Sequence, residues 1–307
     1  MTSRTIKKIV PATATGKITR LIGTVDIDGS GTNHPLESVD PFILLDYGVV
    51  PINEMPPFGA HPHRGHSVIT VLLQGKVKSW DSFKPKGEWY TLTAPASYWV
   101  DAGSGVFHDE RSVIDNEDDE TQHMKLFQLW VGVKESDRSN PPKVQRDENL
   151  ERHECKDAVG NVVGWAICYV GQNSSISTPH PVDVKLIKQQ QKTTYRVPID
   201  SKRNGFVVHV KGAPSFSGTS PNNDLDVLVL ENSDDTANFL EVTTGDEEAE
   251  YLVCTGEPNN EKWVKKLAAN GAVIAATADE ARALVPSVDA MSVAGKAENG
   301  SFAPWGL

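Results

Sequence analysis

Short apolar segments, many of them alternating or rich in β-branched residues, recur through the first half of the chain. Such runs are typical of strands. The run SVITVLL ends at Gln74-Gly75, which predicts a hairpin or a tight connection to the next strand. Helix patterns are almost absent, so the first 133 residues are predicted to be all-β. The predicted strands are residues 67–73, 76–80, 90–100 (interrupted at Pro95) and 125–133.

A polar, charged segment at residues 134–160 separates this half from a second set of strand patterns. It contains Pro141-Pro142 and little apolar sequence, so we expect it to connect two domains. The second half is predicted to contain strands at 161–170, 182–187, 205–210, 225–230 and 250–255, the last of which is the last clear strand pattern. The chain is then predicted to divide into an N-terminal domain at 1–140, a C-terminal domain at 141–290 and a tail at 291–307.

Helical patterns come only after these strands. Residues 261–269 carry apolar side chains at helical spacing. Thr277 and Glu280 fit a capping box, and Pro286 is expected to end the helix that follows at 281–285. The predicted fold class is therefore all-β, with two tandem antiparallel β-sandwich or barrel domains and short C-terminal helices.

The charge balance narrows the classes of function. The formal net charge is -11, whereas binding to a phosphate backbone requires a concentrated positive surface. Direct nucleic-acid binding is therefore not expected, while a small molecule or a protein partner remains compatible. No apolar run approaches the length of a membrane span, so no membrane contact is expected.

The cysteines argue against a disulfide framework. There are three, Cys155, Cys168 and Cys254, an odd number without a CxxC pair. This pattern indicates a reducing compartment, cytoplasmic or nuclear. The first 25 residues are basic and lack acids, as in a transit peptide, but they contain no apolar signal region, and residues 18–27 already have a strand pattern.

Two pairs of polar residues carry the strongest chemical signal. In a strand, residues two apart point to the same face, so His61 and His63 can present two imidazoles to one point. His108 and Glu110 form a second pair with the same spacing. A curved sheet that joined both pairs would give three imidazoles and one carboxylate, a set typical of non-haem iron and related metals. Ordinary loop histidines are the alternative for each pair taken alone.

The same alternation assigns the neighbouring residues. His66 should lie on the face opposite His61 and His63, so it is not expected to be a ligand. Asp101 and Asp109 are interpreted as turn or surface acids. Arg64 either lies beside the site or pairs with a surface acid.

These motifs resemble those of the pirin family, within the cupin superfamily. The string HPHRG at 61–65 is similar to the family signature, and WVDAGSGVFHDE at 99–110 is similar to its second motif, which ends in H-x-E. Residues 41–46 (PFILLD), 128–130 (QLW) and 256–258 (GEP) match further family segments in the same order. The resemblance extends from about residue 18 to residue 285.

The resemblance implies a bicupin, a protein of two tandem cupin domains, with one metal in the N-terminal domain only. The family's iron ligands fall on His61, His63, His108 and Glu110. The implied cofactor is one Fe(II) per chain, with nickel, manganese and zinc left open. The C-terminal domain is expected to lack a metal site, since His180 and His209 stand without a partner at the required spacing.

Two positions depart from the family pattern. After Gly65 the family usually has an aromatic residue and then an acid, whereas this chain has His66-Ser67. Between the two glycines before His108 the family usually has an arginine, whereas this chain has Ser104. We expect the first change to remove a carboxylate near the metal and the second to remove a positive charge near the pocket mouth.

The resemblance also implies an activity. Some pirins are quercetin 2,3-dioxygenases, in which a flavonol or enediol-like substrate loses a proton, reacts with O₂ and undergoes ring opening with loss of carbon monoxide. Glu110 is then the predicted catalytic proton acceptor. Phe58, Phe107, Phe127 and Trp130 either line the pocket or belong to the core. The alternatives are an iron-dependent regulatory protein that binds a protein partner without turnover, and a purely structural metal.

Overall fold

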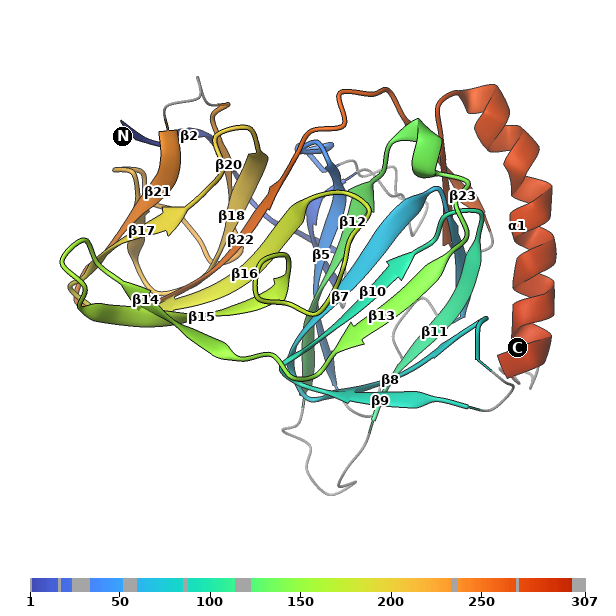
Figure 1. Ribbon diagram of the computed structural model, residues 1–307, viewed down its shortest axis with the longest axis horizontal. Coiled ribbons are helices and arrows are strands. Elements are labelled where there is room, and N and C mark those ends of the chain that lie inside the picture. Colours follow the sequence, from blue (N-terminus) through green and yellow to red (C-terminus); the bar gives the residue numbers. More distant parts are fainter. Residues whose placement is uncertain are drawn as a thin grey trace.

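The computed structural model describes residues 2–15, 18–23, 34–51, 60–84, 88–113, 123–232, 237–268 and 271–299. These residues form four β-sheets, a short 3-10 helix at Glu135–Asp137 and one α-helix, α1 (Ala278–Asn299), as Figure 1 shows. No helix among them is long and apolar enough to cross a membrane. The predicted all-β fold class is confirmed.

Most strands of the first half of the chain belong to two sheets. The seven-stranded sheet has the order β13 (Lys143–Asp147), β10 (Ala96–Asp101), β7 (His66–Gln74), β12 (His123–Gly132), β5 (Phe42–Pro51), β4 (Ile18–Ile22) and β3 (Thr13–Thr15). The six-stranded sheet has the order β23 (Val264–Ala268), β24 (Gly271–Ala275), β6 (His61–Arg64), β11 (Val106–Ser112), β8 (Lys76–Asp81) and β9 (Tyr90–Thr93). β7 and β8 belong to different sheets, so Gly75 (φ +80°) makes a tight connection and not a hairpin.

The second half of the chain forms two further sheets. One has seven strands in the order β14 (Arg152–Lys156), β15 (Val162–Val170), β16 (Val182–Gln189), β22 (Ala249–Gly256), β18 (Asn204–Lys211), β20 (Val227–Leu230) and β2 (Ile6–Val10). The other contains β1 (Thr2–Ser3), β21 (Ala237–Thr244) and β17 (Thr194–Pro198), with β19 (Pro214–Phe216) also paired to β21. All five strands predicted in this half are present, although the sheet structure continues beyond them.

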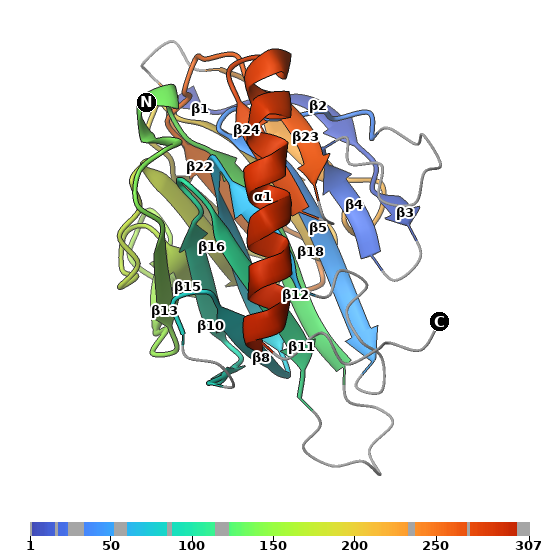
Figure 2. The ribbon, with the colours of Figure 1, turned by 90° about the vertical axis from the view of Figure 1, so that its right-hand side faces the viewer.

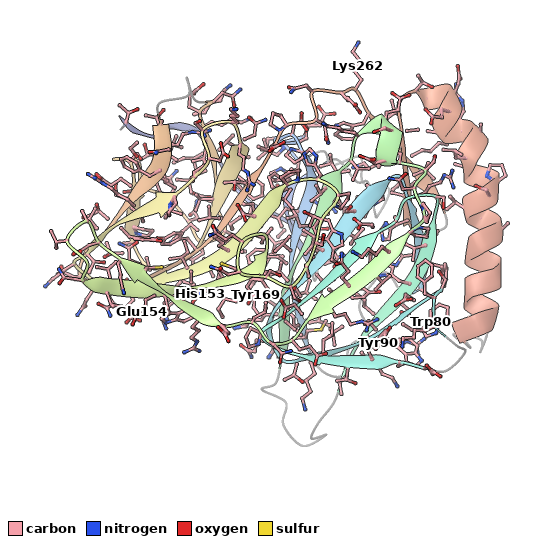
Figure 3. All side chains as sticks on the ribbon, in the orientation of Figure 1. Trp80, Tyr90, His153, Glu154, Tyr169 and Lys262 are labelled. Atoms are coloured by element: carbon pink, nitrogen blue, oxygen red, sulfur yellow. The ribbon has the colours of Figure 1, made fainter. Side chains whose placement is uncertain are left out.

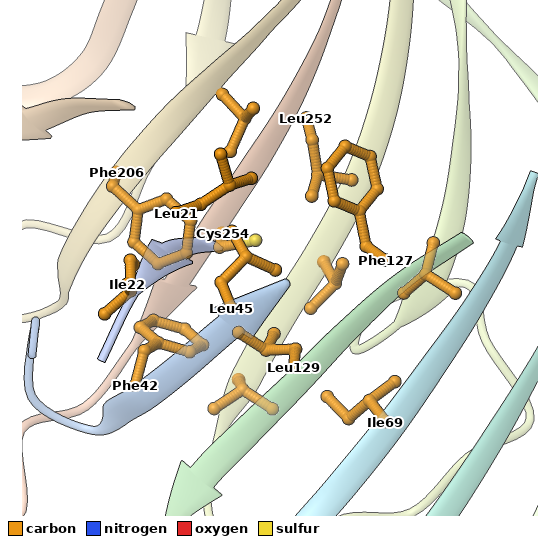
Figure 4. Packing of buried hydrophobic residues seen from close by; sticks show 14 of the residues in the cluster. Leu21, Ile22, Phe42, Leu45, Ile69, Phe127, Leu129, Phe206, Leu252 and Cys254 are labelled. Atoms are coloured by element: carbon orange, nitrogen blue, oxygen red, sulfur yellow. The ribbon is translucent and has the colours of Figure 1, made fainter. Parts of the chain in front are cut away.

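Apolar cores lie between the sheets, which stack as layers. The two seven-stranded sheets pack face to face through a core that includes Phe42, Phe127, Phe206 and Leu252 (Figure 4). Tyr169, labelled in Figure 3, lies at this junction, where its carbonyl accepts a hydrogen bond from Ser97 Oγ at 2.9 Å. The outer faces of these sheets pack on the six-stranded and four-stranded sheets. The junction therefore unites the two halves of the chain.

Strand β7 shows why its sequence is almost continuously apolar. Val68 and Leu72 belong to the core shared with the six-stranded sheet, whereas Ile69 and Val71 belong to the core between the two halves. Both faces of the strand are buried, so both positions of the strand repeat are apolar. The exceptions on its inner face are the polar residues of the candidate site.

Strands at both ends of the chain cross between the halves. β2, near the N terminus, pairs with β20 at the edge of the second-half sheet. β24, which follows the second half, pairs in parallel with β6 of the first half. The division at 1–140, 141–290 and 291–307 stays a prediction as a statement about domains, but the sheets do not stop at these boundaries.

The helix predicted at 261–269 is wrong, because residues 264–268 form β23, and β24 follows at 271–275. Residues 250–255 are therefore not the last strand of the chain. Leu267, which the helical pattern would bury, is 45% exposed. Pairing of β23 with β24, and of β24 with β6, decides the conformation here over the local pattern.

The capping box at the start of α1 is largely confirmed. Thr277 Oγ1 accepts a hydrogen bond from the Glu280 amide at 3.2 Å, and the Glu280 carboxylate accepts one from the Ala276 amide at 3.0 Å. However, Pro286 does not end the helix, which continues to Asn299. A proline inside a helix costs about 3 kcal/mol. Packing of Val288 against Val273 of β24 offsets part of this cost. The helix covers the outer face of the six-stranded sheet (Figure 2).

The segment 134–160 connects the two halves but also contributes strands to both. β13 pairs with β10 of the first half, and β14 pairs with β15 of the second. The sequence pattern did not predict these two strands. β13 and β14 lie at the edges of their sheets, where a strand pairs with a neighbour on one side only. A largely polar sequence is therefore compatible with both pairings.

The core between the two halves gives the first testable prediction. Phe42 is fully buried, and its ring meets that of Phe206 edge to face at 5.2 Å across the two seven-stranded sheets. Phe42→Ala should lower the free energy of unfolding by about 3–5 kcal/mol, because it leaves a cavity between the halves. Urea unfolding measures this quantity.

The matched control is Val159→Ala, at a side chain that is 83% exposed. It should change the free energy of unfolding by less than about 0.5 kcal/mol. A loss below about 1 kcal/mol in Phe42→Ala would mean that the two halves do not depend on this contact.

Candidate metal centre

The predicted histidine ligands come together where β6 and β11 pair. His61 and His63 lie on β6, two residues apart, and therefore on one face. The antiparallel register places His108 of β11 directly opposite His61. Directly opposed residues on one face of an antiparallel pair have Cβ atoms about 5 Å apart. The register thus brings the third imidazole to the first two.

The three rings converge closely. His61 Nε2 and His108 Nε2 are 3.2 Å apart, and the ring centroids of His63 lie 4.7 Å from His61 and 4.9 Å from His108. One ring nitrogen from each of the three residues lies within 4.8 Å of the other two. This cluster could hold a metal ion.

Burial keeps two of these imidazoles neutral. It lowers the pKa of His63 and of His108 well below the usual value, and the neighbouring histidines lower both further. A neutral imidazole offers one nitrogen lone pair, which is the form that binds metals. The surroundings therefore favour the ligand form at neutral pH.

Two buried nitrogens of the cluster have no hydrogen-bond partner within the described part of the chain. They are His63 Nε2 and His108 Nδ1. Buried polar atoms are nearly always paired, since an unpaired one costs free energy. A cation beside His63 Nε2 would satisfy that atom. The donor set of nitrogens therefore fits a transition-metal ion such as iron, nickel or zinc.

Glu110 lies two residues beyond His108 on the same strand, but outside the three-histidine cluster. Its carboxylate accepts a hydrogen bond from Thr70 Oγ1 of β7 at 2.8 Å. Burial raises the pKa of Glu110 to about 7, helped by the charge of Asp109 and opposed by the Thr70 hydrogen bond. Its role as a fourth ligand stays a prediction.

Aromatic rings form walls around the histidines. The Tyr98 ring lies nearly parallel to His108 with centroids 6.2 Å apart, and Trp130 meets His63 edge to face at 5.1 Å. Of the two interpretations of Trp130, pocket lining or core, its contacts with the histidines favour the first. Phe107 belongs instead to a small core with Ala60 and Trp80. Phe127 lies in the core between the halves, and Phe58 is outside the described residues.

The prediction that His66 faces away from the other histidines is wrong. Its Nε2 lies 3.1 Å from His63 Nδ1, and its ring is fully buried. The reason is Gly65, whose φ of +79° ends the regular alternation between β6 and β7. A helpful sequence signal was the glycine itself, because an isolated glycine between strand residues often marks such a bend.

Three other assignments are settled by their contacts. Asp101 is not a free surface acid, since it accepts hydrogen bonds from Ser67 Oγ at 2.7 Å and Trp99 Nε1 at 2.6 Å. Asp109 is also buried and pairs with Arg111. Ser67 therefore lies on the β7 face away from the histidines, so the carboxylate expected near the metal at this position would have pointed elsewhere.

Arg64 and Ser104 are in direct contact. The Arg64 guanidinium donates to the backbone carbonyl of Ser104. This contact ties β6 to the loop that precedes β11. The residue at position 104 thus lies beside the predicted signature, as the family pattern implies.

Two histidines of the second half, His180 and His209, contact backbone carbonyls. His180 Nε2 contacts the Glu257 carbonyl, and the ring nitrogens of His209 contact the carbonyls of Asn223 and Gly212 at 2.9 and 2.7 Å. Among the residues the structure describes, the cluster on β6 and β11 is the one group of three potential ligands that meets in space.

The chain is similar to known proteins of one family. Residues 24–131 match the family model described as Pirin. A protein of Pseudomonas aeruginosa named "Putative quercetin 2,3-dioxygenase" is 27% identical over 73% of this chain and 78% of its own length. A pirin-like protein of tomato (Solanum lycopersicum) is 28% identical over 60% of each chain.

Solved structures share the fold. A quercetin 2,3-dioxygenase from Acinetobacter baumannii superposes with a TM-score of 0.70 at 21% identity, over 98% of this chain and 99% of the other. The bacterial pirin YhhW of Escherichia coli, in complex with nickel(II), gives 0.59 at 15% identity, over 81% and 96%. With its motifs, sheets and matching family model, this chain has the bicupin fold and carries a pirin domain at residues 24–131.

Proposed function

We propose that this protein is a metal-dependent dioxygenase that opens the ring of a flavonol or a related enediol-like molecule. The observation that carries the proposal is the convergence of His61, His63 and His108 beside a carboxyl group suited to proton transfer. The names of the Pseudomonas and Acinetobacter proteins support the same reaction class. We propose Fe(II) as the metal, with nickel, manganese and zinc as alternatives.

The three histidines are the proposed ligands, with Glu110 as a proposed fourth. A metal held there would supply Lewis acidity, which lowers the pKa of a substrate hydroxyl bound to it. The chain's own residues must then receive the proton and hold the substrate. Both tasks can be assigned to residues around the histidine cluster, on β10, β11 and β12.

Glu110 is the proposed proton acceptor. With a pKa of about 7, its carboxyl group is substantially ionised at neutral pH and can both take up and release a proton. Thr70 Oγ1 donates to Glu110 Oε1 and so fixes the orientation of the carboxylate. The second carboxylate oxygen is then the atom that we expect to receive the proton.

Tyr98 and Trp130 are proposed to position the substrate. Their rings flank the histidines and give apolar surfaces that match a flat molecule. Burial raises the pKa of Tyr98 well above its usual value, so its hydroxyl stays protonated and can donate a hydrogen bond. Tyr98 Oη is buried without a partner in the described part of the chain.

The metal site can be tested by metal analysis of freshly purified protein. We expect about one metal ion per chain in the wild type and background levels in His61→Ala/His108→Ala, since the variant keeps only one of the three histidine ligands. Mass spectrometry should quantify iron, nickel, manganese and zinc together. His153→Ala is the control, on β14 in the other half (Figure 3), and should keep the metal. Failure of the wild type to bind any metal, even after reconstitution, would refute the site.

The dioxygenase activity can be tested by O₂ uptake with quercetin. Metal-loaded wild type should consume O₂ only when the flavonol is present, and Glu110→Gln should lower kcat by about 100-fold or more because the amide cannot accept the proton. Because His61, His63 and His108 are unchanged in this variant, it should retain its metal.

Glu154→Gln, at an exposed position on β14 labelled in Figure 3, is the matched control and should keep full activity. Absence of uptake in metal-loaded wild type would contradict the dioxygenase proposal. Metal-dependent capture of a protein partner in that case would favour the regulatory alternative.

A further inference from the structure

The strand connection between β6 and β7 turns His66 toward the histidine cluster. Gly65 has φ +79°, and a Cβ at this position would lie 2.2 Å from the Ile274 carbonyl oxygen. The Gly65 amide donates to the Gly103 carbonyl at 2.9 Å. The bend is therefore fixed by contacts with two other segments, and with it the direction of the next side chain.

The hydrogen bonds of His66 define which of its nitrogens carries the proton. His66 Nδ1 lies 3.1 Å from the backbone carbonyl of Arg64. A carbonyl oxygen only accepts, so the proton of the neutral ring must be on Nδ1. His66 Nε2 is then an acceptor.

This acceptor in turn defines the proton position on His63. His63 Nδ1 lies 3.1 Å from His66 Nε2, so the proton of His63 is on Nδ1. The lone pair of His63 is thereby left on Nε2, which is buried and lacks a hydrogen-bond partner among the described residues. It is the nitrogen available to the proposed metal.

Packing holds both rings in this arrangement. Trp130 contacts the ring of His66 at a centroid distance of 4.8 Å and that of His63 at 5.1 Å. The two imidazoles themselves meet edge to face at 5.0 Å. Neither ring can turn without displacing the indole, so the hydrogen-bonded geometry is the one the core permits.

We propose that His66 is a positioning residue, which holds His63 in the tautomer that presents Nε2 to the metal. The proposal rests on the metal site of the proposed function but does not depend on the reaction. Partners that orient a ligating histidine typically contribute about 10–100-fold to metal affinity. The backbone carbonyl of Arg64 is the fixed end of this chain of hydrogen bonds.

The tautomer can be measured directly in metal-free protein. We expect ¹⁵N NMR of the ring nitrogens at neutral pH to show His63 protonated on Nδ1 in the wild type. His66→Gln should preserve this state, because its amide oxygen can accept the same hydrogen bond. His66→Phe keeps an aromatic ring but offers no acceptor, so His63 should shift toward the Nε2-protonated form. Retention of the Nδ1 proton in His66→Phe would overturn the proposal.

Metal affinity gives a second, independent measurement. In chelator competition with Ni²⁺, His66→Phe should bind about 10–100-fold more weakly than wild type, and His66→Gln should stay within about threefold. Thermal unfolding of the metal-free proteins checks that both variants are folded. Equal weakening in the two variants would show that the ring only fills space and would overturn the role proposed for its acceptor nitrogen.

These measurements separate the two proposals. If wild type binds no Ni²⁺, the metal site fails, whereas the tautomer measurement on metal-free protein still decides whether His66 controls His63. If wild type binds Ni²⁺ and His66→Phe does so equally well, the metal site stands and the role of His66 is refuted.

Discussion

Strand β6 has only four residues, and its pairing on both sides is the constraint on which the metal centre depends. β11 binds one edge in an antiparallel register that places His108 opposite His61, and β24 binds the other edge in parallel. A slip of one residue against β11 would turn His108 to the other face. The parallel partner, β24, follows the second half of the chain. The cluster therefore forms only when β6 has paired both with β11 and with this distant strand.

The division of roles between the faces of β7 explains how the site and the junction coexist. Its inner face carries His66 and Thr70 toward the histidine cluster, and its outer face carries Ile69 and Val71 into the core between the halves. Ser67 and Asp101 lie on this outer side. The departures from the family pattern at positions 66 and 67 therefore have opposite consequences: the first changes the surroundings of His63, while the second is directed away from the cluster.

Tight packing around the buried imidazoles holds their unpaired nitrogens in place despite the cost in free energy. Unpaired nitrogens in a core cost free energy, and they persist only when the surrounding structure holds them in place. Here the indole of Trp130 and the ring of Tyr98 pack against the histidines. The core that contains Phe42 and Phe206 packs against the other face of the seven-stranded sheet of the first half. The second half also consists of β-sheets, but its His180 and His209 contact backbone carbonyls, and its described residues form no cluster of three potential ligands.

The sequence by itself determined the all-β fold class, part of the strands and the three histidines that meet. Strand alternation is a local property, since residues two apart lie on one face, and this spacing can be read directly from the sequence. It failed where long-range contacts decide the outcome. Residues 264–268 form a strand because they pair with β24, which in turn pairs with β6. The helix α1 continues through Pro286, where Val288 packs on Val273. His66 turned inward because Gly65 bends between two sheets. Strand pairing and packing of this kind join residues that are distant in the chain, so the local pattern does not contain their energies. The glycine at position 65 is compatible with a bend, but the contacts that fix the bend also come from distant segments.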